Sequence, residues 1–268
     1  MDLQLTGKRA VVTGGSKGIG LAVARALVDE GAHVVVAGRT AETLEAARAV
    51  LSARAAEGQR VLAVPTDTTS DAAVRQLVEV TVGELGGIDV VVNAAAEPAP
   101  FGSPTSLASL DDDELRRQIE TKVLGYLRTA RAAAPHMAEQ GWGRIINVSG
   151  LAARSAGSTF GTIRNVAVAA MTKNLADELG TSGINVTVVH PGLTVTERTP
   201  AMIEQVAEAR GITQEEAVRA MSQGIAIGRV VTAEEVADVV VFLASPRSVA
   251  ITGDAIAVGG GARGAVHY

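Results

Sequence analysis

The sequence predicts an α/β fold, a single doubly wound domain with a parallel sheet of about seven strands and helices on both faces. Two observations carry this prediction. Short apolar runs alternate along the whole chain with segments whose apolar residues recur at helical spacing. The length of 268 residues, with 47% hydrophobic residues and no repeat or linker, suits one domain with a large core.

A glycine-rich turn joins the first predicted strand to the first predicted helix. Arg9–Thr13 is a short apolar run, and Leu21–Glu30 has helical spacing. A strand, a turn and a helix in this order bring backbone N–H groups and the positive end of a helix to one point, which favours a bound pyrophosphate. The turn reads Thr13-Gly14-Gly15-Ser16-Lys17-Gly18-Ile19-Gly20. Its glycines permit the tight turn and the close approach of the backbone to a ligand.

The remaining predicted elements follow in alternation. Strands are expected at His33–Ala37, Arg60–Val64, Ile88–Asn93, Arg144–Ser149, Asn185–Val189 and Ala255–Val258. Helices are expected at Ala41–Ala56, from the N-cap Ser70 to about Leu85, from the acids at 111–113 to Glu139, at Thr162–Leu179, and at Ala233–Ala244 behind the N-cap Thr232. The loop Ala94–Leu110 contains three prolines. Residues 194–232, with a polar helical stretch over Thr199–Gly224, are predicted to form a lid, and residues 262–268 a tail.

Composition excludes several classes of function. The net charge is −5 without a basic block, which argues against nucleic-acid binding. The chain has no cysteine and four dispersed histidines, so no disulfide, thiol nucleophile or metal site is expected. The apolar runs are too short to span a membrane, and the N-terminus lacks the pattern of a signal peptide. We expect a soluble, cytoplasmic protein.

The spacing Thr-Gly-x-x-x-Gly-x-Gly resembles that of the short-chain dehydrogenase/reductase family, and the resemblance extends from about Leu5 to Gly261. It implies a Rossmann-type fold, a nicotinamide dinucleotide cofactor, a small-molecule substrate with a carbonyl or alcohol group, and a homodimer or homotetramer. The long helix and the alanine-rich helix after Asn165 are expected to pack against their copies in another subunit.

The second predicted strand ends without the acid that would bind a ribose diol. Gly38 leaves room there, Arg39 offers a guanidinium suited to a phosphate, and Lys17 adds a second cation. This pattern resembles family members that prefer NADP(H), with NAD(H) as a possible second cofactor. The alternative is that Arg39 and Lys17 are two solvated surface cations.

Three further segments match cofactor-binding motifs of the family. Asp67 matches the acid that binds adenine, Asn93-Ala94-Ala95 the motif Asn-Ala-Gly, and Pro191-Gly192 the segment that holds the nicotinamide carboxamide. Open α/β sheets bind ligands at the carboxyl ends of their strands, where all these segments lie. The residues expected to bind the cofactor are Gly14, Ser16, Lys17, Gly18, Ile19, Gly20, Arg39, Thr40, Asp67, Thr68, Asn93, Ala94, Pro191, Gly192, Thr194 and Thr196.

The resemblance fails at the four catalytic positions, where the family uses Asn, Ser, Tyr and Lys. Aligned from their flanks, these positions hold Lys122, Gly150, Gly161 and Asn165. No tyrosine lies between Tyr126 and Tyr268, so a shift of the alignment does not restore the proton donor. Lysine and asparagine have in effect exchanged places. A partly buried Lys122 next to the nicotinamide would have a lowered pKa and act as acid or base, or it points to solvent or pairs with a glutamate at 120 or 178.

Other residues are candidates for the missing groups. The proposed catalytic set is Lys122, Ser149, Thr162, Asn165 and His190. His190 precedes Pro191 and titrates near neutral pH when unperturbed, or serves as a hydrogen-bonded structural residue. Tyr126 is expected to pack in the core. His267 or Tyr268 in the tail enters a pocket and supplies an acid, or the tail is a frayed terminus.

These observations favour an NADP(H)-dependent oxidoreductase of the short-chain type with a non-standard active site. Two alternatives remain open because the four catalytic positions have changed. One is a lyase or isomerase on the same scaffold that uses Lys122 or His190. The other is a catalytically inactive dinucleotide-binding subunit or sensor. Turnover without net change in NADPH would indicate the first, and cofactor binding without chemistry the second.

Overall fold

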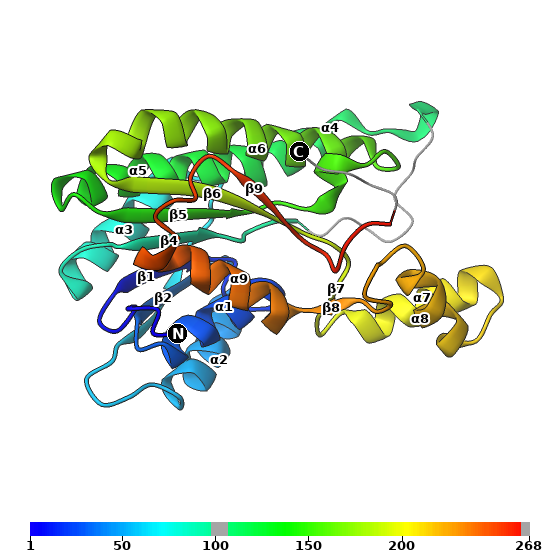
Figure 1. The fold of residues 1–268 in the computed structure, drawn as a ribbon, viewed down its shortest axis with the longest axis horizontal. Coiled ribbons are helices and arrows are strands. Elements are labelled where there is room, and N and C mark those ends of the chain that lie inside the picture. The colour runs from blue at the N-terminus through cyan, green and yellow to red at the C-terminus, as the bar shows by residue number, and fades with distance from the viewer. Residues whose placement is uncertain (98–106, 264–268) are drawn as a thin grey trace.

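The computed structural model describes residues 1–97 and 107–263 and contains the predicted parallel sheet (Figure 1). Seven strands lie in the order β3-β2-β1-β4-β5-β6-β9, and every neighbouring pair is parallel. Their bounds are β1 Arg9–Thr13, β2 His33–Gly38, β3 Val61–Pro65, β4 Val90–Asn93, β5 Gly143–Val148, β6 Ile184–Pro191 and β9 Ala255–Val258. The doubly wound fold class is confirmed.

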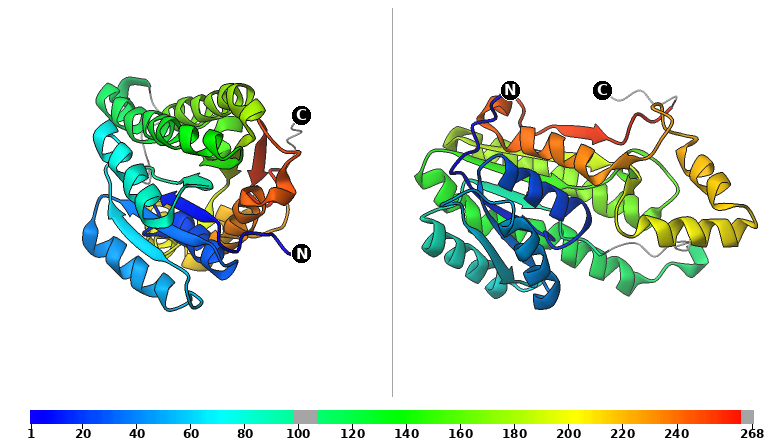
Figure 2. Two further views of the ribbon diagram at one scale, coloured as in Figure 1. Left: turned by 90° about the vertical axis from the view of Figure 1, so that its left-hand side faces the viewer. Right: turned by 90° about the horizontal axis from the view of Figure 1, so that it is seen from below.

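Helices cover both faces of the sheet, in two layers that Figures 1 and 2 show from different sides. One layer holds α1 (Gly18–Asp29), α2 (Ala41–Ser52) and α9 (Ala233–Ala244). The other holds α3 (Asp71–Leu85), α5 (Gly125–Glu139) and α6 (Thr159–Leu179). Successive residues of a strand point to opposite faces, so β1 contributes Val12 to the first layer's core and Val11 to the second's. This double burial explains why the strands are apolar throughout.

The long helix expected from Asp111 to Glu139 is divided. It consists of α4 (Asp112–Gln118), a π-helical turn η2 (Ile119–Leu124) and α5. Asp111 caps α4 by accepting a hydrogen bond from the N–H of Asp113. Turns of π-helix are rare and occur often at functional sites, and this one carries Lys122.

The predicted lid region contains two helices rather than one. They are α7 (Thr199–Arg210) and α8 (Gln214–Ser222), and they pack through a small cluster of their own that includes Val206 and Ala217. Gly211, at φ +62°, ends α7, because this left-handed backbone conformation disfavours side chains. Strands β7 (Thr194–Val195) and β8 (Val231–Thr232) pair at the base of this segment, which projects from the sheet domain in Figure 1.

The other differences from prediction are at element ends. Helix α6 begins at Thr159 rather than Thr162, because the Ser158 hydroxyl caps it by accepting from the N–H of Gly161. Helix α2 ends at Ser52, earlier than expected. Four short 3₁₀ turns complete the list, η1 (Leu107–Ser109), η3 (Leu151–Arg154), η4 (Gly180–Ser182) and η5 (Pro246–Ser248).

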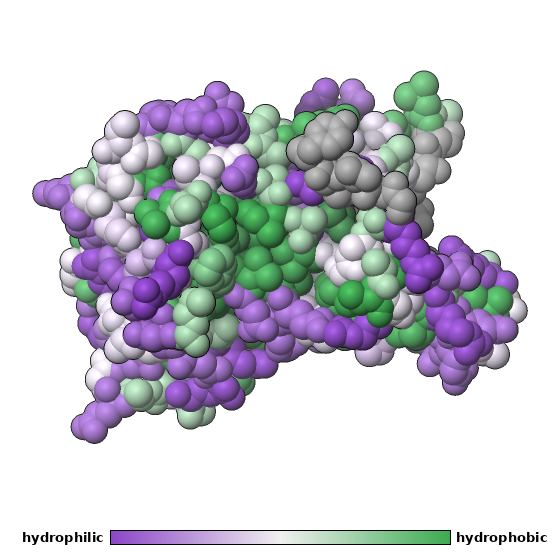
Figure 3. All heavy atoms as spheres, viewed as in Figure 1, coloured by the Kyte–Doolittle hydropathy of each residue, from purple (hydrophilic) through white to green (hydrophobic). Residues whose placement is uncertain are grey.

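Strand β9 forms one edge of the sheet, and apolar side chains gather over it on the face that Figure 3 shows. Its Ala257 is exposed and its other three residues are half-buried. An uncovered apolar edge strand tends to be covered by another protein surface.

Candidate active site

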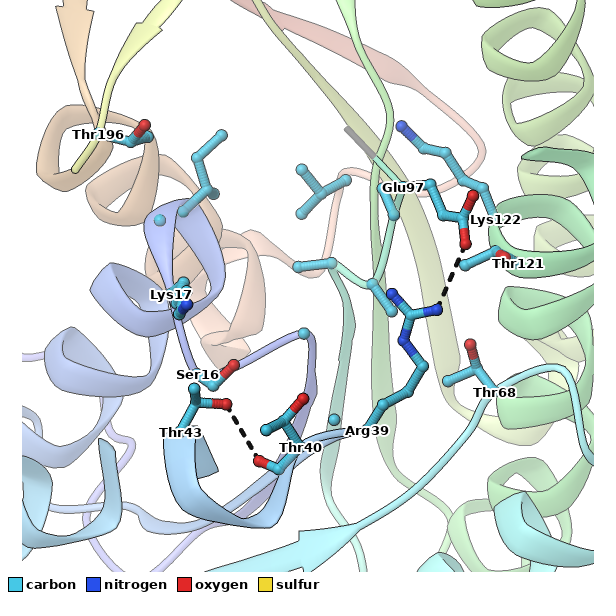
Figure 4. Close-up of a pocket in the computed structure, with 18 of the residues that line it drawn as sticks. Ser16, Lys17, Arg39, Thr40, Thr43, Thr68, Glu97, Thr121, Lys122 and Thr196 are labelled. Carbon is cyan, nitrogen blue, oxygen red and sulfur yellow. Dashed lines mark hydrogen bonds and ion pairs between the residues drawn. The ribbon is translucent and has the colours of Figure 1, made fainter. Parts of the chain in front are cut away.

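A cleft of about 640 Å³ opens at the carboxyl ends of the strands (Figure 4). The strand register brings these ends together, because Thr13 lies opposite both Ala37 and Asn93, and Asn93 lies opposite Asn147. The order of the strands reverses between β1 and β4, and such a switch point is where doubly wound sheets bind ligands.

Three glycines of the turn after β1, Gly14, Gly15 and Gly20, leave no room for a Cβ. Gly14 has φ +68°, and a Cβ there would lie 2.8 Å from the carbonyl carbon of Ala94. The N–H of Gly14 donates to the carbonyl of Ala37 at 2.8 Å. Gly20 also resists substitution, because an added Cβ would lie 2.2 Å from the carbonyl oxygen of Gly14. The glycines therefore hold a turn whose backbone is open to the cleft.

The N-terminus of α1 faces the cleft and is contacted by an anion. Lys17, its N-cap residue, makes no side-chain capping bond. The N–H of Gly18 instead donates to Oε2 of Glu197 at 3.1 Å. Unpaired N–H groups and the helix dipole attract negative charge at this end, so a carboxylate from the lid region lies where a phosphate would bind.

Arg39 extends from the end of β2 into the same cleft. Its guanidinium is 63% exposed and pairs with the carboxylate of Glu97 at 3.3 Å. Figure 4 shows this pair on the far side of Thr40 from Ser16 and Thr43. Strand β2 contributes no acid to this part of the cleft.

Asp67 follows β3 and lies at the rim of the cleft. Its Oδ1 accepts hydrogen bonds from the N–H of Thr69 at 3.0 Å and from the hydroxyl of Thr69 at 2.8 Å. These bonds, with the charges of Arg39 and Arg128, hold the pKa of Asp67 below its ordinary value. It is therefore an ionised acceptor at neutral pH.

Lys122 is buried at the other end of the cleft from Ser16 and Thr43 (Figure 4). The side chain is 4% exposed, and Nζ donates to the carbonyl oxygen of Ser149 at 2.9 Å. Glu120 pairs with Arg128 instead, and no ion pair joins Lys122 to a glutamate of the described residues. Burial, with a smaller effect of the Arg164 charge, lowers the pKa of Lys122 to about 7.

Ser149 links Lys122 to Asn165. Its hydroxyl donates to the backbone carbonyl of Asn165 at 3.2 Å, while its own carbonyl accepts from Lys122. The side chain of Asn165 is buried, and its Oδ1 has no hydrogen-bond partner among the described residues. The amide of Asn165 also fills the space beside Gly150, where a Cβ would approach its Nδ2 to 2.9 Å.

The other candidate acids lie away from the cleft. His190 is buried in β6, and burial, with the nearby charges of Arg154 and Lys122, lowers its pKa to about 4. It is neutral at physiological pH. The hydroxyl of Tyr126 donates to the carbonyl of Val148 at 3.0 Å inside the core, and burial raises its pKa far above its ordinary value. The Thr162 hydroxyl donates to the carbonyl of Ser155 at 3.1 Å.

Sequence reasoning missed Arg164, which also lines the cleft. It stands on α6 one residue before Asn165 and is half-buried. Its Nη1 donates to Oε1 of Gln118 at 2.9 Å, and its Nε has no hydrogen-bond partner in the part of the chain that the structure describes. The sequence shows only that Arg164 stands on the same helix as Gly161 and Asn165. An arginine in that place cannot be distinguished from an ordinary surface cation by sequence alone.

The structure brings most of the predicted residues together. Eleven of the expected cofactor residues line the cleft: Gly14, Ser16, Lys17, Gly18, Ile19, Arg39, Thr40, Asp67, Thr68, Ala94 and Thr196. Of the proposed catalytic set, Lys122 and Ser149 do. The predicted site residues that do not line the cleft are Gly20, Asn93, Thr162, Asn165, His190, Pro191, Gly192 and Thr194.

Asn93, which does not line the cleft, takes part in a buried hydrogen-bond chain. Its Nδ2 donates to Oδ1 of Asn147 at 3.0 Å, and Nδ2 of Asn147 donates to the hydroxyl of Thr172 at 2.9 Å. This buried chain ties β4 to β5 and α6 behind the cleft. The proposed acids His267 and Tyr268 lie outside the described residues.

Comparison with known proteins agrees with this geometry. A family model described as enoyl-(acyl carrier protein) reductase, one of the short-chain dehydrogenase/reductase models, matches residues 14–263. The chain belongs to the short-chain dehydrogenase/reductase family. It is 36% identical over 253 residues to the short-chain reductase protein NovJ of Streptomyces niveus, which covers 94% of this chain and 92% of that protein. It is 35% identical to an uncharacterized oxidoreductase of Methylorubrum extorquens, over 97% of this chain and 99% of that one.

Solved structures give the same family. The L-sorbose reductase of Gluconobacter frateurii, crystallised with NADPH and L-sorbose, superposes with a TM-score of 0.90 at 30% identity. The match covers 99% of this chain and all of that one. Among the residues described here, no helix has the length and apolarity needed to cross a membrane, and no group of three or more acidic or histidine side chains forms a metal site.

Proposed function

We propose that the protein is an NADP(H)-dependent oxidoreductase that interconverts a carbonyl and an alcohol, with Lys122 in place of the family's tyrosine as the proton-transferring group. The observation that supports this most is the position of a buried lysine with a pKa of about 7 in the lining of the cofactor cleft. A group with a pKa near neutrality can both give and accept a proton at physiological pH.

The cleft fits a nicotinamide dinucleotide. The bare turn at Gly14 and the N-terminus of α1 would receive the pyrophosphate, and Arg39 with Lys17 would receive the 2′-phosphate. Asp67 would accept from the adenine. The NADPH bound by the related L-sorbose reductase supports NADP(H) over NAD(H).

A bound NADPH would supply the hydride. The chain's own part in reduction is to hold the substrate and to protonate its oxygen. Lys122, held by the carbonyl of Ser149 at 2.9 Å, would donate a proton from Nζ to the carbonyl oxygen. In the oxidation direction the neutral amine would accept that proton. Burial keeps water from competing for Nζ, and the same burial brings its pKa within reach of both roles.

Stopped-flow measurements of NADPH oxidation against a panel of ketones and aldehydes test this function. Lys122→Ala should reduce the rate of oxidation by about 10²–10⁴-fold with little change in NADPH affinity, because a general acid contributes that much. Lys173→Ala is the matched control, since Lys173 lies on α6, is exposed and pairs with Asp177. Equal rates in the Lys122 variant and the wild type would reject Lys122 as the proton donor.

A specific observation also favours a second function, a dinucleotide-binding subunit without turnover. The position aligned with the family's tyrosine is Gly161, and the space beside it is filled by Ser158, whose Oγ would lie 2.6 Å from an added Cβ. The one tyrosine in the described residues, Tyr126, is buried in the core. Tight NADPH binding with no oxidation of any compound in the panel would support this second function.

We also propose that the protein is a homo-oligomer, a dimer or a tetramer. Helix α6 exposes Ile163 and Val166, 44% and 46% accessible, on a face that no described element covers. Exposed apolar residues on one helix face support packing against another copy. Size-exclusion chromatography with light scattering tests this, and a monomer at micromolar concentration would reject it.

A further inference from the structure

Two cationic side chains meet at the same end of the cleft. Lys122 and Arg164 both line it, and the charge of Arg164 contributes to the lowered pKa of Lys122. Lys122 is buried, and Arg164 is half-buried with its Nε fully buried. Buried cations are normally paired with carboxylates, because an isolated buried charge is costly.

No carboxylate of the described residues is paired with either cation. Lys122 donates to a backbone carbonyl, and Nη1 of Arg164 donates to the amide oxygen of Gln118 at 2.9 Å and to the backbone carbonyl of Glu97 at 3.4 Å. The carboxylate of Glu97 is engaged by Arg39. The charge of Glu114 acts on Arg164 from a distance, but its carboxylate accepts hydrogen bonds from Gln118 and Arg117 rather than from Arg164.

The guanidinium of Arg164 has a free edge. Its Nη1 is held by Gln118, which fixes the plane of the group. Its Nε is buried and lacks a partner among the described residues. A buried N–H without an acceptor costs free energy, so this edge is expected to receive one from a ligand. Carboxylates match the edge of a guanidinium, where two parallel N–H groups meet two oxygens.

The cofactor phosphates have receptors elsewhere. The N-terminus of α1 lies near Ser16 and Lys17, on the opposite side of the cleft from Lys122 in Figure 4. Arg39 is separated from Arg164 by Glu97, which contacts both through different groups. An anion at Arg164 is therefore expected to come from the substrate.

We propose that Arg164 binds a carboxylate of the substrate, so that the protein acts on carbonyl compounds that carry a carboxylate, the oxo acids, and on the corresponding hydroxy acids. This inference rests on the proposed oxidoreductase function. The carboxylate occupies the free Nε edge, and the carbonyl of the same molecule reaches Nζ of Lys122. The negative charge of the carboxylate partly offsets the charges of Lys122 and Arg164. A neutral ketone offers no such charge.

Equilibrium binding tests the proposal independently of turnover. The probes are straight-chain 2-, 3- and 4-oxo acids of four to eight carbons, each compared with its methyl ester, titrated calorimetrically into the protein saturated with NADP⁺. Inorganic phosphate is a further probe. At least one acid should bind about 10–100-fold more tightly than its ester, which corresponds to one charged hydrogen-bonded pair. If no acid is preferred over its ester, or if phosphate binds more tightly than every acid, the proposal is overturned.

Variants assign the preference to Arg164. Arg164→Gln should remove the difference between acid and ester while leaving NADPH affinity within about twofold, and Arg164→Lys should restore part of it because charge remains but the fork is lost. Lys173→Gln, an exposed cation on the same helix, should change neither. Retained NADPH binding shows that each variant is folded. An Arg164→Gln protein that binds NADPH normally and keeps its preference for acids overturns the assignment.

The outcomes also separate this proposal from the proposed function. If the wild-type protein prefers acids but oxidises no NADPH with them, the carboxylate site stands and the oxidoreductase function fails. If it reduces acids and esters with equal efficiency, the function stands and the carboxylate site fails.

Discussion

Replacement of Lys122 by methionine should stabilise the protein at pH 6. Methionine matches lysine in length but carries no charge. The pKa of Lys122 falls from 10.5 to about 7 on burial. Because one pH unit corresponds to about 1.4 kcal/mol, burial of the protonated amine costs about 5 kcal/mol below pH 7. The lost hydrogen bond to the carbonyl of Ser149 offsets about 1–3 kcal/mol, so the net gain is about 2–4 kcal/mol.

The gain should shrink as the pH rises. Between pH 7 and 10.5 the unfolded chain keeps the lysine proton while the folded wild-type protein has released it, so wild-type stability rises with pH in this window. The advantage of Lys122→Met should therefore fall by about 3 kcal/mol between pH 6 and pH 9. His190 does not titrate in this range because burial lowers its pKa to about 4.

Urea denaturation at fixed protein concentration measures both effects, with the variant and the wild type compared at pH 6 and pH 9. Lys173→Met, the same substitution at an exposed lysine of α6, is the control. A stability difference for Lys122→Met that is the same at both pH values would refute the argument that this lysine is buried with a depressed pKa.

Three further predictions concern the cofactor cleft. Glu197→Gln should tighten NADPH binding about 2–5-fold at low salt, because it removes a negative charge from the N–H of Gly18. A fluorescence titration measures this, and weaker binding would show that Glu197 helps to hold the cofactor. Arg39→Gln should weaken NADPH binding about 10–100-fold and leave NADH binding unchanged, and equal loss for both would exclude a 2′-phosphate contact. Gly14→Ala should lower the free energy of unfolding by about 1–3 kcal/mol in urea denaturation and abolish NADPH binding. The reason is that an added Cβ would meet the backbone of Ala94 and that φ is +68° at this position. Retained NADPH affinity would contradict a close approach of the cofactor to the backbone at Gly14.

The sequence predicted the sheet and many of the residues that line the cleft, because both depend on local patterns. Apolar strands buried on two faces are readable without tertiary information, as Val90–Asn93 illustrates. The glycine turn at Gly14 is readable for the same reason, since its conformation excludes other residues. Helix ends were less accurate, as for α6, where a capping bond from Ser158 set the first turn.

Only the tertiary structure decided which candidate side chains reach the cleft. His190 and Asn165 stand at strand ends or on helices beside it, but their side chains point into the packed interior. Lys122 reaches the cleft because the π-turn and the carbonyl of Ser149 direct it there. Arg164 carries no sequence signal. Its guanidinium is held by Gln118, which lies 46 residues away, and only the folded structure shows that its Nε has no partner among the described residues.

The sequence by itself determined the fold class, the family and the glycine-rich turn after β1, because hydrophobic periodicity and glycine conformation act between residues close in the chain. Burial, charge pairing and pKa belong to residues that meet through folding. The pair of cations formed by Lys122 and Arg164 is therefore a property of the tertiary structure alone, and the proposed substrate class depends on it.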